Sequence, residues 1–147
     1  MEINWLAVFV ASLSSFVIGA IWFGPKTFYP VWMKALRGSV PTERTEMKLA
    51  ETLVMFGGTY LGALIQVATL ALLMSVSNFK VLETGAANGA LLGFTVAVGV
   101  GAFSSLSHRM FGHPNGRVYQ GLKVWLIEVG QDVLCLTVAG AILGAWV

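Results

Sequence analysis

The chain alternates between four long apolar stretches and short polar segments. The apolar stretches cover about residues 4–23, 52–77, 85–106 and 124–147. A helix that crosses a bilayer needs about 20 apolar residues. Within the bilayer core a segment must satisfy its own backbone hydrogen bonds, which a helix does. None of the stretches alternates apolar and polar residues as a barrel strand does. The pattern therefore predicts four transmembrane helices and an all-α fold.

The composition indicates a membrane protein with one domain. Hydrophobic residues make up 56% of the chain and charged residues 11%, whereas a soluble domain has about 25% charged residues. The chain thus lacks the polar surface to face water on every side, and 147 residues suit a single transmembrane domain over 1–147. The net charge of +2 is small and dispersed, so we expect a lipid bilayer and no nucleic acid as partner. The single cysteine, Cys135, excludes an internal disulfide and a Cys-rich metal site.

Basic residues gather in the first and third loops. These are Lys26, Lys34, Arg37 and Arg44 in the first loop, and Arg109, Arg117 and Lys123 in the third. The second loop has only Lys80, and the termini have no Lys or Arg. Basic loops stay in the cytoplasm, so both termini are predicted outside the cell (cytoplasmic) membrane. The first stretch has neither a basic start nor a small-residue cleavage site, so we expect it to be retained.

The first loop has a helical pattern of its own. Its apolar residues Phe28, Tyr29, Trp32, Met33 and Leu36 are interspersed with Lys26, Lys34 and Arg37. The spacing predicts a short amphipathic helix in the headgroup layer, with its basic groups toward lipid phosphate. An ordinary aromatic belt is the alternative. Under either interpretation the expected interfacial anchors are Trp22, Phe28, Tyr29 and Trp32.

Small residues recur every four positions in the third stretch. They are Gly85, Gly89, Gly93, Ala97, Gly101 and Ser105. The same interval separates Gly140 from Gly144 in the fourth stretch and Gly58 from Gly62 in the second. Small residues at this spacing allow helix backbones to approach closely. The pattern predicts tight packing against a helix of the same chain or of another copy, and a path for a solute is the alternative.

The fourth stretch contains polar residues, Glu128, Gln131 and Asp132. Counted from Val124, Glu128 lies roughly 6 Å and Asp132 roughly 12 Å along the helix, which brings Asp132 toward the middle of a core about 30 Å thick. The two acids are four residues apart, so they share one helix face with Gly140. We expect that face to point toward protein. A carboxylate at the centre of a span costs about 2.5–3.5 kcal/mol, so some compensation is expected.

Three kinds of compensation are open for these acids. Protonation removes the charge. Ion pairing would use a cation at the same end of the helix: Lys48, Arg109 or Lys123. Hydrogen bonds would come from Ser12, Ser14, Ser15, Gln66, Thr95 or Ser104. The functional interpretation is a cation or proton relay, or a polar ligand pocket, and the structural one is a buried network that sets helix register. Depth favours the functional interpretation for Asp132 and the structural one for Glu128.

No pattern in the sequence indicates catalysis. His108 and His113 are five residues apart, do not share a helix face and have no third ligand beside them, so no metal site is expected. The chain has no Ser/His/Asp order, no P-loop and no dinucleotide-binding turn. We therefore predict a protein that is not an enzyme and has no cofactor.

A few aromatic motifs near the start resemble those of a known family. Asn4-Trp5, Trp22-Phe23-Gly24-Pro25, and Phe28 with Trp32 together resemble the membrane family called domain of unknown function 1761. The resemblance covers most of the chain, although Phe23 stands where many members have Tyr, and Gly130-Gln131 departs from a Gly-Tyr pair. It implies a small bacterial-type integral membrane protein and brings no activity or catalytic residue.

The sequence thus predicts an integral membrane four-transmembrane-helix bundle, with a short interfacial amphipathic helix between the first two spans. The expected function is membrane permeation, or binding of an ion or small ligand, through the polar face of the fourth helix. Candidate residues are Glu128, Asp132, Gln131, Gln66, Ser14 and Ser15. The alternative is a non-catalytic assembly or accessory subunit that packs through its small-residue faces. Its partner would be a second copy of the chain or another membrane subunit.

Overall fold

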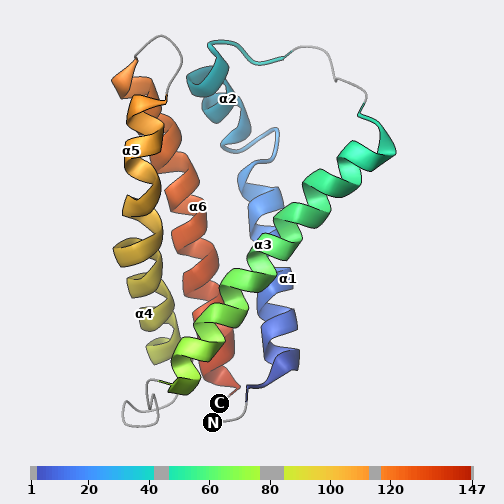
Figure 1. The fold of residues 1–147 in the computed structure, drawn as a ribbon, viewed down its shortest axis with the longest axis vertical. Helices are drawn as coiled ribbons and strands as arrows, with labels where there is room; N and C mark the ends of the chain where they lie inside the picture. Colours follow the sequence, from blue (N-terminus) through green and yellow to red (C-terminus); the bar gives the residue numbers. More distant parts are fainter. Residues whose placement is uncertain (1–2, 42–46, 77–84, 113–116, 147) are drawn as a thin grey trace.

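The computed structural model describes residues 3–41, 47–76, 85–112 and 117–146. Its elements are α1 (Trp5–Trp22), α2 (Tyr29–Arg37), α3 (Leu49–Val76), α4 (Ala86–Val96), η2 (Ala97–Ala102), α5 (Phe103–Phe111) and α6 (Val118–Ala145). The elements α4, η2 and α5 follow one another without a break and form one span (Figure 1). Four helical segments are long and apolar enough to cross a membrane. The predicted all-α fold with four transmembrane helices is therefore confirmed.

Three helices extend beyond their predicted ends at residues 52, 106 and 124. They begin at Leu49, end at Phe111 and begin at Val118. The added turns hold polar residues such as Arg109 and Lys123, because a helix continues past the part of it that lies in lipid. Apolar length therefore marks the membrane portion and not the whole helix. Five residues that enter the predictions lie outside the described ones: Arg44, Ser77, Lys80, His113 and Val147.

Side chains satisfy the free backbone groups at both ends of α1. At the start, the side chain of Asn4 accepts a hydrogen bond of 3.2 Å from the N–H of Ala7. At the end, the Thr27 hydroxyl lies 2.6 Å and 2.7 Å from the carbonyl oxygens of Ile21 and Trp22. Terminal carbonyls have no partner within a helix. Thr27 therefore stabilises the turn that leads from α1 into α2.

α2 is the short helix predicted between the first two spans. Pro30 lies in its first turn, where a missing N–H leaves no hydrogen bond unmade. Gly38 ends the helix at a φ of 84°, which glycine adopts without strain. Met33 and Ala35 are buried whereas Lys34 is exposed. α2 lies at the end of the bundle opposite the start of α1, beside the first turns of α6 (Figure 1).

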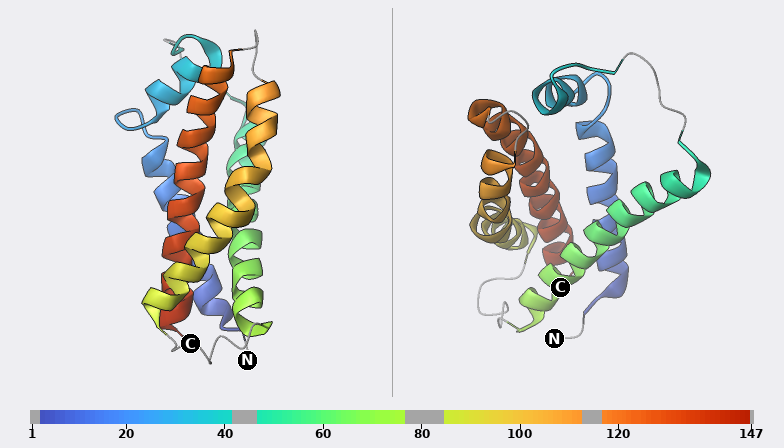
Figure 2. Two further views of the ribbon diagram at one scale, coloured as in Figure 1. Left: turned by 90° about the vertical axis from the view of Figure 1, so that its left-hand side faces the viewer. Right: turned by 45° about the horizontal axis from the view of Figure 1, so that its top comes forward.

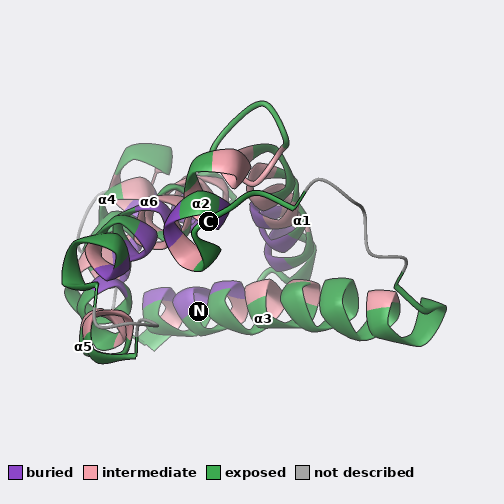
Figure 3. Cartoon of the chain, turned by 90° about the horizontal axis from the view of Figure 1, so that it is seen from above, coloured by how far each residue is buried: buried purple, intermediate pink, exposed green. Residues whose placement is uncertain are grey.

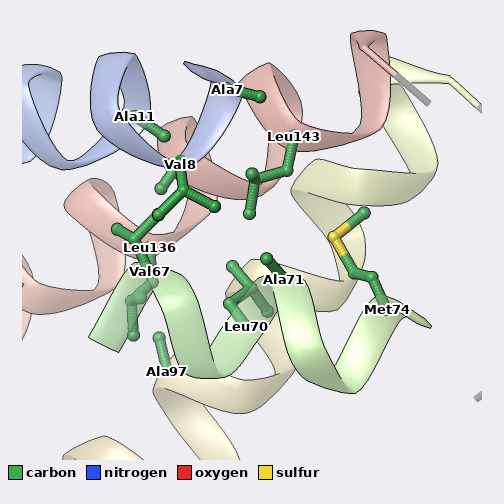
Figure 4. Close-up of a cluster of buried hydrophobic side chains, with 11 residues drawn as sticks. Ala7, Val8, Ala11, Val67, Leu70, Ala71, Met74, Ala97, Leu136 and Leu143 are labelled. Carbon is green, nitrogen blue, oxygen red and sulfur yellow. The ribbon is translucent and has the colours of Figure 1, made fainter. Parts of the chain in front are cut away.

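α6 is the central helix of the bundle and contacts α1, α2, α3 and the third span. The third span crosses α6 obliquely, as Figure 2 shows. The core lies where these helices meet, toward the end that holds the start of α1 (Figure 4). Its buried members are Ala7, Val8, Ala11, Val67, Leu70, Ala71, Met74, Ala97, Leu136, Ala139 and Leu143. The members from α3 all come from its C-terminal half.

The N-terminal half of α3 leans away from the other helices (Figures 1 and 3). No residue of α3 before Val67 is buried. Exposed apolar side chains line this half: Leu49, Leu53, Val54, Met55, Phe56 and Leu61. Its ring contacts are to α1, where Phe16 lies edge-on to Phe56 and Tyr60 at centroid distances of 6.4 and 5.9 Å. Only the C-terminal half of α3 therefore belongs to the packed core.

α4 and α6 pack backbone against backbone through glycines. A Cβ atom added at Gly89 would overlap the carbonyl oxygen of Gly140, and one added at Gly140 would overlap that of Gly89. At Gly93 the obstacle is the carbonyl oxygen of Leu136. Gly144 lies against Gly89 in the same contact. Any residue larger than glycine would separate these helices.

The helix face of the third span shifts at η2. A π-helical turn bonds residue i to i+5 and so holds an additional residue. The buried positions are accordingly five apart, at Ala97 and Ala102. Gly101, which the four-residue spacing placed in the packing stripe, is exposed, and no atom of another helix lies within 4 Å of its Cβ position. The π turn thus removes Gly101 from the packing within this chain.

Candidate functional site

Both carboxylate oxygens of Glu128 have partners inside the protein. Nε of Arg109 on α5 lies 2.7 Å from Oε2. The indole Nε1 of Trp32 on α2 donates a 3.0 Å hydrogen bond to Oε1. The Glu128 and Arg109 side chains are 21% and 43% exposed, so the pair is partly shielded. Of the three cations that the sequence offered, Arg109 is the one that pairs with Glu128. One carboxylate joins α2, α5 and α6.

The predicted anchors Trp22, Phe28, Tyr29 and Trp32 form a cluster of aromatic rings beside α6. Trp22 stacks on Phe28 at a centroid distance of 4.3 Å, and its Nε1 donates to the carbonyl oxygen of Ile127 at 3.0 Å. Trp32 contacts Tyr29 at 6.3 Å. The two tryptophans are only partly exposed. They therefore hold the α1–α2 turn to α6, in addition to any contact with lipid.

Gln131 faces α1 and leads into a buried chain of hydrogen bonds. Its Nε2 donates to Sγ of Cys135 at 3.3 Å, and that Sγ donates to the carbonyl oxygen of Ser15 at 3.4 Å. The Gln131 amide also lies against Gly19, whose Cβ position would be 3.2 Å from Nε2. Gln131 and Ser15, both candidates from the sequence, are thus joined through Cys135. The sequence reasoning missed Cys135 as a member, although it lies one turn from Gln131 on the same face.

Asp132 is exposed at the middle of α6. At 1.5 Å per residue it lies about 21 Å from Val118 and about 20 Å from Ala145. Leu136 and Ala139 occupy the same face of the helix and are buried. Within the described ranges, the Asp132 carboxylate has no hydrogen bond and no ion pair. The expectation that this face points toward protein therefore holds for its other residues but not for the Asp132 side chain.

The remaining candidate hydrogen-bond donors do not reach either acid. Ser14 and Ser15 both donate to the carbonyl oxygen of Ala11, at 2.8 and 3.1 Å. Thr95 and Ser104 likewise donate to carbonyls of their own helices. Gln66 is exposed on α3, and no partner for its amide lies in the described part of the chain. Hydroxyl groups within one helix are satisfied locally, so spacing alone could not identify them as partners of a distant acid.

Ser12 is a buried polar residue that the structure joins to α3. It is 0% exposed, donates to the carbonyl oxygen of Phe9 at 2.8 Å and lies 3.3 Å from the hydroxyl of Tyr60. Tyr60 did not enter the sequence reasoning. A tyrosine inside a span could have indicated this contact, because a tyrosine hydroxyl that is buried usually has a hydrogen-bond partner.

The polar side chains that can act chemically in this region are two carboxylates, the amide of Gln131 and the thiol of Cys135. Among the residues that the structure describes, no group of three His, Cys, Asp or Glu side chains could hold a metal ion. Glu128 is neutralised by Arg109. An ionised carboxylate accepts hydrogen bonds and binds cations, so Asp132 is the group that is left free to do so.

Four membrane-crossing helices with one short helix at the end of the bundle make this a multi-pass membrane protein. The chain belongs to the family described as "Protein of unknown function (DUF1761)", whose model matches residues 6–144. The resemblance found in the aromatic motifs is thereby confirmed. No curated protein and no solved structure matches the chain. The family description carries no activity, so a function has to be argued from the geometry.

Proposed function

We propose that Asp132 binds a small cation, or the cationic group of a small ligand, within the membrane, and that the protein acts in membrane permeation or ligand binding. The observation that carries the proposal is an exposed, unpaired carboxylate halfway along a membrane-spanning helix. Such a group costs about 2.5–3.5 kcal/mol in lipid. The described residues supply neither an ion pair nor a hydrogen bond to it, so a bound cation or a bound proton is left to compensate the charge.

The position of α3 supports access to Asp132. Leu136, one turn farther along α6, belongs to the core that includes Val67 of α3. Asp132 precedes Leu136 by one turn of α6, and α3 has no buried residue before Val67. A cation would therefore reach Asp132 from the part of the bundle that lies outside the packed core. Glu128 would serve a different purpose, because its charge is already paired.

The direct test is flux through proteoliposomes. With a pH-sensitive dye or a potassium-sensitive dye enclosed, the wild-type protein is expected to pass protons or K⁺ faster than empty vesicles. Asp132→Asn keeps the side-chain shape and removes the charge, so it is expected to reduce that flux at least tenfold. Cation-dependent thermal stabilisation of the purified protein gives a second readout, and it also detects a binder that does not conduct.

Glu128→Gln is the matched control, because it makes the same acid-to-amide change one turn away. It is expected to lower stability while leaving flux and cation binding intact. If Asp132→Asn leaves both flux and cation-dependent stabilisation unchanged, the proposal fails. It also fails if Glu128→Gln remains folded but loses flux and cation-dependent stabilisation to the same extent as Asp132→Asn.

The proposed orientation follows from the basic loops, with both termini outside the cell membrane and α2 on the cytoplasmic side. It is tested by replacing Cys135 with Ser and introducing cysteine at exposed Ser39. A maleimide that does not cross membranes is expected to label the Ser39→Cys variant in inside-out vesicles and not in right-side-out vesicles. The reverse labelling would overturn the orientation.

A second candidate function is that of an assembly or accessory subunit, which the open half of α3 favours. Gly57, Gly58 and Gly62 have no atom of another helix within 4 Å of their Cβ positions. A helix with this spacing packs well against a partner helix. Gly62→Leu is expected to weaken association between copies, or with a membrane partner, while the isolated chain stays folded. A wild-type protein that is monomeric and isolated without any partner would contradict this role.

A further inference from the structure

A cavity lies between α2 and the first turns of α6. Its volume is about 410 Å³. The residues that line it are Pro30, Val31, Lys34, Ala35, Val40, Gln120 and Lys123. It is separate from Asp132 and from the aromatic cluster. Its position is set by the contact of α2 with α6, where Trp32 donates to Glu128.

The polar lining of this cavity is cationic. Lys34 from α2 and Lys123 from α6 face the cavity from its two walls, together with the amide of Gln120. Among the described residues that line the cavity there is no acid. In the described ranges the one ion pair joins Arg109 to Glu128, so neither lysine is neutralised there. Two ammonium groups at one cavity repel each other, and an anion held between them would turn that repulsion into attraction.

The apolar lining points to an anion that carries hydrocarbon. Pro30, Val31, Ala35 and Val40 form the rest of the surface. Inorganic phosphate would gain nothing from these side chains, whereas the glycerol backbone and first methylenes of a phospholipid would bury apolar area against them. Lys123 directly precedes Val124, where the apolar part of α6 begins. The cavity therefore lies at the depth of lipid headgroups, if the span crosses the bilayer as its composition indicates.

We propose that the cavity between α2 and α6 is a binding site for an anionic phospholipid. Lys34 and Lys123 would bind the headgroup phosphate, Gln120 would donate a hydrogen bond to it, and Val31 and Val40 would pack on the upper acyl chain. Basic pockets at the ends of transmembrane helices recognise anionic lipids by this combination of charge and apolar contact. The site does not depend on the role proposed for Asp132, since the two share no residue.

The test is native mass spectrometry of the detergent-purified protein with added phosphatidylglycerol, and with phosphatidylcholine for comparison. Wild-type protein is expected to retain phosphatidylglycerol and to retain phosphatidylcholine much less. A lysine whose ammonium group lies beside the bound headgroup strengthens anionic-lipid binding about fivefold. The double variant Lys34→Gln with Lys123→Gln is therefore expected to weaken binding on the order of 25-fold. Equal retention of the two lipids by the wild type would overturn the proposal.

The matched control is Lys26→Gln with Lys48→Gln, which removes two exposed lysines outside the cavity. It is expected to change binding less than twofold. An equal loss in the control and the cavity variant would mean that total charge, not the cavity, attracts the lipid, and the proposal would fail. Melting of each variant, followed by circular dichroism, shows whether weaker binding comes from loss of the site or from loss of the fold. Val31→Asn is a further variant that changes the cavity and leaves both lysines in place.

Val31→Asn also separates a lipid from free phosphate. It is expected to weaken phosphatidylglycerol binding about fivefold through lost apolar contact. Millimolar inorganic phosphate is expected not to displace the bound lipid. Displacement by inorganic phosphate, or unchanged lipid binding in Val31→Asn, would overturn the assignment to a lipid.

Discussion

The contact between α4 and α6 and the N-terminal half of α3 have the same spacing of glycines and opposite environments. Gly89 and Gly93 lie against the backbone of α6, whereas Gly58 and Gly62 face open space. On α6 these glycines meet Gly140, Gly144 and the backbone of Leu136. The residues of α3 that meet α1 are Phe56 and Tyr60, which contact Phe16, whereas Gly58 and Gly62 lie on the other side of the helix. A four-residue spacing of glycines thus gives the capacity for close packing, and within this chain that capacity is used only where another helix lies opposite the glycines, as α6 does for α4.

The largest expected effect comes from adding the same side chain to each region. Gly140→Leu would drive a side chain into the backbone of α4, so we expect it to lower the free energy of unfolding by more than about 3 kcal/mol. Gly62→Leu has open space and should change it by less than about 0.5 kcal/mol. Unfolding in mixed micelles, followed by circular dichroism, measures both. Similar losses in the two variants would remove the distinction between the regions.

A second pair of variants tests where the packed face of the third span continues after η2. Ala102 is 4% exposed, and its carbonyl oxygen accepts a 2.8 Å hydrogen bond from Nε1 of Trp125. Ala102→Leu is expected to cost about 2 kcal/mol through overpacking, and Gly101→Leu less than about 0.5 kcal/mol. The same unfolding assay applies. If Gly101→Leu proved the more harmful change, the face would follow the regular four-residue spacing instead.

The polar contacts of α6 supply a third comparison, because one acid is paired and the other is not. A double-mutant cycle with Glu128→Gln and Arg109→Gln is expected to give a coupling of about 1 kcal/mol for this partly exposed pair. Asp132→Asn should alter the free energy of unfolding by less than about 0.5 kcal/mol. A coupling near zero would show that the pair contributes nothing to holding α5 on α6.

The smallest expected effect concerns the hydrogen bond that joins α3 to α1. Tyr60→Phe removes the hydroxyl that lies 3.3 Å from Ser12, and we expect it to cost about 0.5–1 kcal/mol. Tyr119→Phe is the control, since Tyr119 is 88% exposed and its hydroxyl should not affect stability. Thermal melting in detergent compares the two variants. Equal melting temperatures for Tyr60→Phe and the wild type would indicate that ring packing on Phe16 alone holds this half of α3.

The spans and the short helix between the first two could be predicted because apolar length and amphipathic spacing are properties of one segment. The side chains that pair with the polar residues of α6 could not be predicted in this way. Which cation meets Glu128 depends on where α5 lies around α6, and three cations suited the same end of the helix equally well. Asp132 was predicted to face protein and its side chain is exposed, because spacing shows which residues share a helix face but not how far the neighbouring helices cover that face.

The additional residue in η2 has a consequence for the rest of its span. Each residue of an α-helix advances the chain by about 100° around the helix axis. One residue inserted between α4 and α5 therefore rotates every later side chain of the span by about 100° around the helix axis. The glycine face before the insertion stays in contact with α6. Arg109 lies after this phase shift. In an uninterrupted α-helix that kept Gly89 and Gly93 in place, its guanidinium would be rotated away from Glu128.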